Sequence, residues 1–269
     1  MRIGAKEFNT KEKAYVMGIL NVTPDSFSDG GKYQSVDTAL KHAETMIRDG
    51  AAILDVGGES TRPGYERITE EEELSRILPV ITAIKERFDI PVSVDTYKSK
   101  VAKEAIKAGA DMINDIWGLK ADPDMGRVIA QGKVACCLMH NRKDTEYKNF
   151  VSDLMKDLRE SVDLARRAGI EDERIMLDPG IGFAKTYEQN LLALKHLGKM
   201  TEIGLPILLG TSRKSVIGLT LDLPKEERLE GTLATTILGL KDGACFFRVH
   251  DVKEHVRAIA MAEAILKAR

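Results

Sequence analysis

Short apolar segments alternate with longer segments of helical period along the whole chain, and this repeat restricts the fold more than any other feature. The apolar segments are nearly continuous rather than alternating, which is typical of parallel strands buried on both faces. The eight expected strands cover residues 15–21, 53–57, 91–95, 112–116, 134–140, 175–178, 206–210 and 244–250. The eight expected helices cover residues 36–48, 69–88, 99–107, 123–131, 151–168, 187–200, 225–241 and 252–267.

The repeat runs through the chain without a linker, a low-complexity tract or a change of composition. Eight consecutive strand and helix units predict an α/β fold, a closed (β/α)₈ barrel in which residues 1–269 form a single domain. Such a barrel needs about 250 residues, so the length agrees. A doubly wound open sheet is the alternative at this stage, because hydrophobic periodicity does not give the order of the strands.

Local signals mark several helix ends. Thr69 and Glu72 have the spacing of a capping box, and Asp122 followed by Pro123 predicts an N-cap and the first residue of a helix. Glycine is common just after a helix, and three glycines follow expected helices: Gly50, Gly109 and Gly169.

Composition restricts the binding partners and the cellular compartment that we expect for this chain. With 40 Lys and Arg against 42 Asp and Glu, the net charge of −2 gives no electrostatic reason to expect nucleic acid or a membrane surface as a partner. The first fifteen residues lack the apolar core of a signal peptide, and no apolar run approaches the ~18 residues of a transmembrane helix. The three cysteines lie in apolar runs without metal or redox spacing, which predicts buried free thiols and a reducing cytoplasm.

Every expected strand ends in polar or ionisable residues, and in this fold the strand ends meet at one mouth. Each of these residues alone could be a helix cap or a satisfied core group. The complete set favours a convergent site: Asn21, Asp55, Glu59, Asp95, Asn114, Asp115, His140, Asp178, Ser212, Arg213, Lys214, Arg248, His250 and Asp251.

The set divides by charge. Asp95, Asn114 and Asp178 follow strands three, four and six, and buried carboxylates and amides need partners such as the N–H groups of an amino-substituted heterocycle. Flat apolar contact for such a ring could come from Ile116, Met139 and Phe183. A second, cationic group indicates an anionic ligand part such as a phosphate, unless Lys214 and Arg248 pair with the same acids: Arg62, Lys214, Arg248 and His250.

Three glycine-containing segments follow strands. Residues 21–31 and 57–64 are either mobile lids or ordinary solvated turns. Residues 178–183 hold a Gly-x-Gly, but Lys185 stands where a dinucleotide fingerprint has its third glycine, so the segment is weak support for NAD. The sequence contains neither a Walker-type phosphate loop nor a nucleophile elbow.

Seven motifs occur in order along the chain, at residues 17–31, 53–64, 93–96, 113–116, 178–183, 210–215 and 248–251. Together they resemble the motifs of the bacterial dihydropteroate synthases, and the resemblance covers nearly the full length of the chain. Residues 141–143, Asn-Arg-Lys, are the least similar to the family, and we expect them to affect the periphery more than the chemistry.

The resemblance implies condensation of 7,8-dihydropterin-6-ylmethyl diphosphate with 4-aminobenzoate. Catalytic roles then fall to Asp95, Asp178, Lys214 and Arg248. The pterin site would contain Asp95, Asn114, Ile116, Met139, Asp178 and Lys214. The diphosphate would meet Asn21, Thr61, Arg62, Arg248 and His250, with Mg²⁺ on Asn21. The aminobenzoate site, where sulfonamides compete, would contain Phe27, Pro63, Phe183 and Ser215.

Dimerisation through the outer helices is a further expectation from the family.

Three alternatives to the synthase make different demands on these residues. A pterin-binding methyltransferase would need a cobalamin partner, and residues 21–31 and 210–215 speak against it. A non-catalytic pterin-binding or regulatory protein predicts loss of the diphosphate residues, which are present. A sugar-phosphate barrel enzyme would leave Asp95, Asn114 and Asp178 without an evident partner.

Overall fold

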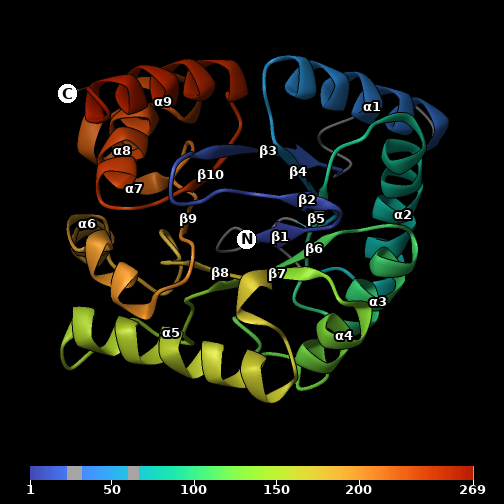
Figure 1. The fold of residues 1–269 in the computed structure, drawn as a ribbon, viewed down its shortest axis with the longest axis horizontal. Coiled ribbons are helices and arrows are strands. Elements are labelled where there is room, and N and C mark those ends of the chain that lie inside the picture. Colours follow the sequence, from blue (N-terminus) through green and yellow to red (C-terminus); the bar gives the residue numbers. More distant parts are fainter. Residues whose placement is uncertain (23–31, 60–66, 269) are drawn as a thin grey trace.

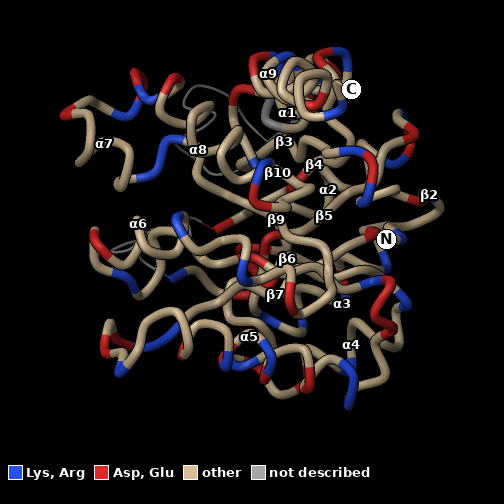
Figure 2. The backbone as a smooth tube through the Cα atoms, turned by 60° about the vertical axis from the view of Figure 1, so that its left-hand side comes forward, with Lys and Arg blue, Asp and Glu red and all other residues tan. Residues whose placement is uncertain are grey.

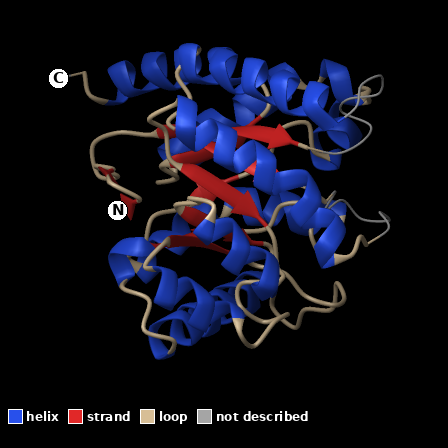
Figure 3. Ribbon diagram, turned by 90° about the vertical axis from the view of Figure 1, so that its right-hand side faces the viewer, coloured by secondary structure: helices blue, strands red, loops and turns tan. Residues whose placement is uncertain are grey.

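Eight parallel strands form a ring at the centre of the structure, and helices surround the ring (Figures 1 and 3). The structure is a computed structural model of the chain and describes residues 1–22, 32–59 and 67–268, without the side chains of residues 32–35. The ring strands are β3 (Tyr15–Asn21), β4 (Ile53–Gly57), β5 (Val92–Asp95), β6 (Met112–Asp115), β7 (Ala135–Met139), β8 (Ile175–Asp178), β9 (Leu208–Leu209) and β10 (Phe246–Val249).

The order of the strands decides between barrel and open sheet. Each strand pairs with its neighbour in sequence from β3 to β8, while β10 pairs with both β9 and β3. A parallel bridge between Leu177 of β8 and Ile207, just before β9, closes the remaining gap. The ring therefore has no open edge along these strands, which confirms the predicted (β/α)₈ barrel and excludes the doubly wound sheet.

The outer layer contains nine α-helices among the described residues. They are α1 (Lys32–Arg48), α2 (Glu70–Arg87), α3 (Ser99–Lys107), α4 (Met125–Gly132), α5 (Phe150–Arg167), α6 (Tyr187–Lys195), α7 (Ser215–Leu221), α8 (Leu229–Lys241) and α9 (Val252–Leu266). Short 3₁₀ turns, η2 (Asp172–Arg174), η3 (Leu197–Ile203) and η4 (Lys225–Glu227), join some of them. The helix expected over 187–200 is thus α6 followed by η3, and the one expected over 225–241 begins as η4. The sequence patterns missed α7, a helix of seven residues of which only the first, Ser215, stood out, as the end of the motif at 210–215.

The predictions for the helix ends are confirmed only in part. Thr69 Oγ1 accepts the amide N–H of Glu72 at 3.2 Å, as a cap should, but the carboxylate of Glu72 binds Arg76 at 2.5 Å instead of completing the box. The prediction for Asp122 was wrong: α4 begins at Met125, and Asp122 accepts the amide of Ser99 at 2.8 Å. Asp122 therefore caps α3, a contact that local spacing cannot reveal. Left-handed backbone follows helices at all three predicted glycines, Gly50, Gly109 and Gly169.

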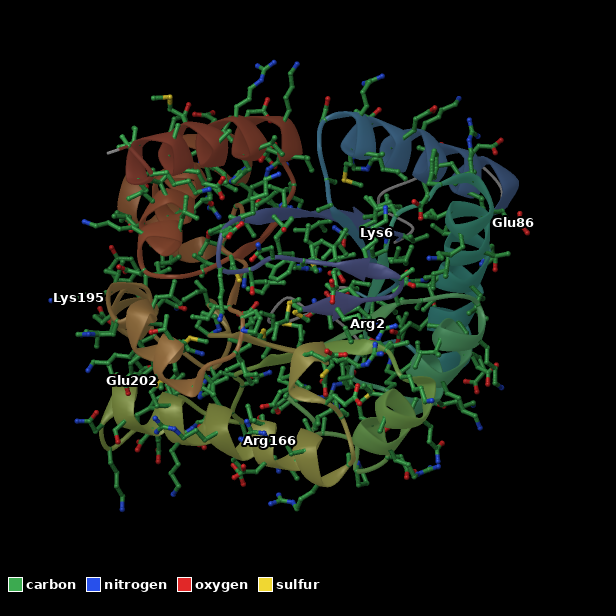
Figure 4. All side chains as sticks on the ribbon, viewed as in Figure 1. Arg2, Lys6, Glu86, Arg166, Lys195 and Glu202 are labelled. Carbon is green, nitrogen blue, oxygen red and sulfur yellow. The ribbon has the colours of Figure 1, made fainter. Side chains whose placement is uncertain are left out.

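A short hairpin of β1 (Arg2–Ile3) and β2 (Lys6–Glu7), also missed by the sequence patterns, covers the end of the barrel where the strands begin. Ile3 and Phe8 pack with the starts of the ring strands, and Phe8 lies against Phe246 with ring centroids 5.6 Å apart. Figures 1 and 4 place the N-terminus and the labelled Arg2 near the centre of the ring. The hairpin thus seals one end of the barrel, and its two-residue strands are too short for a periodic signal.

The hydrophobic core has two parts. One cluster fills the space between strands and helices, and a second lies inside the ring near the hairpin. Cys136 belongs to the first cluster and Cys137 to the second, as alternation along a strand requires. All three cysteines are buried and free, which confirms the prediction of buried free thiols. Among the described residues, no helix is long and apolar enough to cross a membrane.

Candidate active site

Charged side chains lie inside the ring at the end opposite the hairpin, where the strands end. Figure 2 shows acidic segments among the central strands, whereas most other charged segments lie on the outer helices. The strand register brings Asp95 beside Asn114 and Met139 beside Asp178. Both pairs belong to the predicted pterin site, and the ring brings them to the same mouth.

Arg248 joins two of the buried acids. Its Nε donates to Asp55 Oδ2 at 2.5 Å and its Nη2 donates to Asp95 Oδ2 at 2.7 Å. Asn114 Nδ2 donates to the same oxygen of Asp55 at 3.3 Å. The pairing considered as an alternative for Arg248 is therefore present in the structure. Its predicted contact with a diphosphate stays a prediction.

The other oxygens of the two acids are buried acceptors. Asp55 Oδ1 and Asp95 Oδ1 have no hydrogen-bond partner within the described ranges. A buried acceptor without a donor costs about 1–3 kcal/mol. Burial raises the pKa of Asp95 to about 7 although Arg248 opposes the shift. Burial also works against the charge of Arg248, but Asp55 and Asp95 outweigh it and raise the pKa of Arg248. The mouth thus offers oxygen atoms to a ligand that carries N–H donors.

Asp178 and Lys214 line the same space from the other side of the mouth. Asp178 Oδ1 accepts the amide of Gly180 at 2.6 Å, and Lys214 Nζ donates to the carbonyl of Ile181. A Cβ atom on Gly210 would lie 3.6 Å from Asp178 Oδ2 and 3.9 Å from Lys214 Nζ, so both groups border the space that this glycine leaves open. Burial raises the pKa of Asp178 and lowers that of Lys214 to about 8, and each charge opposes the shift of the other.

Apolar surface accompanies these polar groups. Ile116 and Met139 are buried, yet they belong to neither core cluster, as expected for side chains that line a mouth. Lys214 Nζ lies 5.0 Å from the centre of the Phe183 ring, so the predicted aromatic wall adjoins the predicted pterin site. Ser215, the first residue of α7, is exposed next to Lys214.

Two further predicted residues border the mouth. Asn21 is half-buried at the end of β3, and a Cβ atom on Gly57 would lie 3.6 Å from its Oδ1 and 3.7 Å from Cβ of Asp95. Asn21 is thus close to Asp95. His250 Nδ1 lies 2.9 Å from Ser212 Oγ, which orients its ring after β10. The predicted contacts of Phe27, Thr61, Arg62 and Pro63 fall outside the described residues.

Several polar strand ends serve the scaffold instead. Asp115 accepts the amides of Trp117 and Leu119 at 2.9 and 2.7 Å and shapes the turn after β6. Other residues form ion pairs or hydrogen bonds next to the mouth. These pairs are Glu59 with Lys98, Asp251 with Arg213, and His140 with Asp157 and Lys185.

Sequence reasoning gave two buried residues no role. Asp55 was noted as a strand end, and only the folded ring shows that it shares Arg248 with Asp95. Lys185 was noted only because it replaces a glycine. The signal that could have singled it out is a lysine directly after a glycine-rich turn, a place where such a cation can bind backbone carbonyls.

Known proteins match this chain over most of its length. The pterin binding enzyme family matches residues 17–250. A dihydropteroate synthase of Clostridium beijerinckii is 62% identical over 268 residues, 99% of this chain and 100% of the relative. A solved Clostridium difficile dihydropteroate synthase, crystallised in the presence of pteroic acid, has 48% identity and a TM-score of 0.95, covering 97% of this chain and 100% of that one.

A Yersinia pestis dihydropteroate synthase in complex with a sulfonamide drug has 40% identity and a TM-score of 0.93, covering 100% of this chain and 99% of that one. The barrel, its mouth and the family match define the class: the chain belongs to the pterin-binding enzymes. Its identity to full-length relatives places it, within that class, in the dihydropteroate synthase family of transferases.

Proposed function

We propose that this chain condenses 7,8-dihydropterin-6-ylmethyl diphosphate with 4-aminobenzoate, forming 7,8-dihydropteroate and pyrophosphate for folate biosynthesis. The observation that carries the proposal is the buried Asp95 Oδ1, which has no partner in the described structure and adjoins Asn114 in the strand register. An aminopterin ring supplies the N–H donors that this acceptor requires. The relatives with pteroic acid and a sulfonamide support the same substrate class.

The pterin ring would lie across the mouth. Asp95 and Asp178 accept its N–H groups from opposite sides, while the Asn114 amide and the Lys214 ammonium meet its acceptor atoms. The buried Ile116 and Met139 side chains pack against the ring faces. Two carboxylates in one buried site also favour the positive charge that develops on the pterin when its diphosphate leaves.

The diphosphate would meet Arg248 and His250, together with Thr61 and Arg62. Within the described ranges no group of three His, Cys, Asp or Glu side chains could hold a metal ion. Mg²⁺ often has only one or two protein ligands and takes its other oxygens from substrate phosphates and water. The half-buried Asn21 oxygen beside the acids fits that single role. Mg²⁺ bound there would neutralise charge on the diphosphate and help it to leave.

The aminobenzoate would lie on the outer side of the pterin, against Phe183 and Ser215, with Phe27 and Pro63 completing the site. Lys214, 5.0 Å from the Phe183 ring centre, lies between the two substrates. A sulfonamide has the same arylamine and a similar anionic end. We therefore expect sulfonamides to compete with aminobenzoate rather than with the pterin substrate.

The reaction would follow a dissociative path. The bond from the pterin methylene carbon to the diphosphate oxygen breaks, and pyrophosphate keeps the electron pair. The aminobenzoate nitrogen then donates its lone pair to that carbon and releases a proton to the surroundings. A neutral arylamine already attacks without a strong base, so Arg248 acts by preorganised charge rather than by proton transfer.

The order of these steps can be tested without aminobenzoate. The protein is incubated with the pterin diphosphate, Mg²⁺ and labelled pyrophosphate, and incorporation of label into the substrate is followed. Exchange is the expected result. A strict requirement for aminobenzoate before any pyrophosphate is released would contradict the dissociative order.

The overall reaction is tested by incubating the protein with pterin diphosphate, aminobenzoate and Mg²⁺ and following dihydropteroate. We expect turnover that a chelator abolishes, and strong loss of turnover in Lys214→Ala and Asp178→Asn. A folded wild-type protein that makes no product from verified substrates would overturn the proposed function. Wild-type kinetics in either variant would remove that residue from the site.

A homodimer is part of the proposal. Large apolar side chains are exposed on four consecutive helices of the outer layer, α6 to α9, which neighbour one another in Figure 1: Leu191, Leu192, Leu219, Leu221, Leu238, Met261, Ile265 and Leu266. Apolar clusters of this kind are typical of subunit interfaces. Leu219→Glu should shift the protein toward monomer in light scattering, whereas Lys103→Glu, at an exposed position on α3 away from these helices, should not. The three free thiols support a reducing compartment, the cytoplasm.

A further inference from the structure

Lys185 lies behind the mouth rather than in it, and its ammonium group is enclosed by acceptors. Its Nζ lies 2.9 Å from His140 Nδ1, 2.9 Å from the Gly180 carbonyl and 3.0 Å from the Phe183 carbonyl. A lysine ammonium has three N–H donors, so the three acceptors match its capacity. Burial lowers the pKa of Lys185 to about 7, with Asp178 opposing the shift. Such a costly buried cation indicates a specific role.

A chain of polar side chains orients this ammonium. Burial lowers the pKa of His140 to about 4, so its ring is neutral near pH 7. Because Nδ1 then accepts from Lys185, Nε2 carries the proton and donates to Asp157 Oδ2 at 3.1 Å. Arg142 Nε donates to the same carboxylate oxygen at 2.6 Å. The chain therefore runs from Arg142 at the surface through Asp157 and His140 to Lys185.

The turn that Lys185 holds contacts both halves of the proposed site. The Gly180 amide binds Asp178, and the Ile181 carbonyl binds Lys214, whose ammonium faces the Phe183 ring. Gly180 has φ of +68°, and a Cβ there would lie 2.0 Å from the His140 carbonyl oxygen. The turn is thus pressed against the end of β7 in a shape that needs glycine and outside support.

We propose that Lys185 is a positioning residue for the aminobenzoate site: by binding the Gly180 and Phe183 carbonyls it holds the Phe183 ring in place, and the Arg142, Asp157 and His140 side chains orient it. The inference rests on the proposed function, because it concerns the second substrate of that reaction. It gives a role to Arg142, in the segment least similar to the family.

The geometry also says which substrate should respond. Asp178 belongs to β8, which pairs with β7, so the pterin side has support from the strand that does not depend on Lys185. Phe183 lies in the turn beyond the strand, and its own carbonyl is one of the three acceptors. Losing the ammonium should therefore disturb aminobenzoate binding more than pterin binding.

The first test is steady-state kinetics of Lys185→Met, which keeps the apolar stem and removes the donors. We expect KM for aminobenzoate to rise about tenfold, with kcat and KM for the pterin diphosphate within about threefold of wild type. Equal changes in both KM values, or none, would overturn the proposal. Wild-type turnover is measured in parallel, so failure of the proposed function is recognised separately by a wild-type protein without product.

A double-mutant cycle with Phe183→Ala tests whether Lys185 acts through that ring. If it does, Lys185→Met should change KM for aminobenzoate by less than about twofold in the Phe183→Ala background. Fully additive effects would contradict the proposed route.

If Lys185→Met does not fold, Arg142→Gln keeps the proposal testable. Gln replaces one polar side chain with another at this partly exposed position, so the substitution removes the charge beside Asp157 without placing an apolar group there. We expect a rise of about two- to threefold in KM for aminobenzoate alone, because the orientation of the ammonium is weakened rather than lost. Lys143→Gln, at an exposed neighbouring position, is the matched control and should behave as wild type. An unchanged KM in Arg142→Gln would exclude that residue and, with it, the proposed orienting chain.

Discussion

The two ends of the barrel interior contrast sharply although the same strands build both. Near the hairpin most inward side chains are apolar, among them Ile53, Met112, Met176 and Phe246, although the buried Ser93 lies in the same layer. Two residues further along the same strands stand Asp55, Asn114, Asp178 and Arg248. Two residues correspond to about 6.6 Å, and the period of two keeps both layers on the same face. The apolar layer that stabilises the fold and the polar layer that forms the proposed site are thus adjacent inside one barrel.

The difference between the layers is energetic. The lower layer buries apolar surface and is covered by the hairpin, which stabilises the fold. The upper layer holds buried charges and two acceptors that lack partners among the described residues, features that cost stability in the free protein. A site that binds a polar heterocycle needs such unsatisfied groups, and we expect the two ends to respond differently to substitution.

The largest effect should come from Arg248→Met in the upper layer. The substitution leaves Asp55 and Asp95 without their cation, so we expect turnover to fall about 10³-fold and the free energy of unfolding to fall by about 3–5 kcal/mol. Turnover assays and urea unfolding measure the two quantities. Arg166→Met, which breaks an exposed pair with Asp172, is the control and should keep wild-type turnover. Wild-type turnover in Arg248→Met would remove the main distinction between the layers.

Phe246→Ala tests the lower layer. This ring is fully buried and packs against Phe8 and Tyr15, so its loss should cost about 3–5 kcal/mol of stability. The KM values of the remaining folded enzyme should stay within about twofold, because the apolar cluster that contains the ring includes none of the predicted site residues. Urea unfolding measures the loss of stability, and steady-state kinetics measures the two KM values. A large change in either KM would mean that the two layers are coupled.

The pH dependence of the free energy of unfolding should distinguish the two ends of the barrel, because the buried Asp95 lies at only one of them. Burial raises its pKa to about 7 in the folded protein, against about 3.9 in the unfolded chain. Between these values the folded state holds a proton that the unfolded chain has released, so this group's contribution to stability falls as pH rises from about 4 to 7 and is then constant. Denaturant unfolding at several pH values should show a steeper fall in wild type than in Asp95→Asn, where Asp115 and Asp178, whose pKa values burial also raises, retain part of the fall. Asp89→Asn, an exposed acid near the hairpin, should retain the wild-type slope; parallel profiles in all three proteins would refute the assignment.

The smallest effect is expected for Lys6→Gln in the hairpin. Lys6 Nζ binds the Asp89 carbonyl at 2.5 Å, but the Lys6 side chain is 41% exposed and that of Asp89 is 98% exposed, so the loss should be below about 1 kcal/mol with unchanged turnover. Thermal unfolding and the synthase assay would check both. A loss of turnover would show that the hairpin influences the mouth.

Much of the fold was predictable because the signals are local. Strands β3, β4 and β8 have the predicted bounds, and the other ring strands lie within the predicted ranges, since continuous apolar runs mark buried parallel strands. The hairpin, α7 and the cap made by Asp122 were missed: two-residue strands have no period, and Asp122 acts on a different helix from the one it precedes.

The sequence by itself determined the eight-fold repeat and the residue types at the strand ends. Only the tertiary structure decided which side chains meet: Arg248 with Asp55, 193 residues apart, and Lys185 with His140, 45 residues apart. Hydrophobic period is a property of neighbours along the chain and survives in the sequence. Contacts across the ring depend on closure and on the lengths of side chains, and these exist only once the barrel has formed.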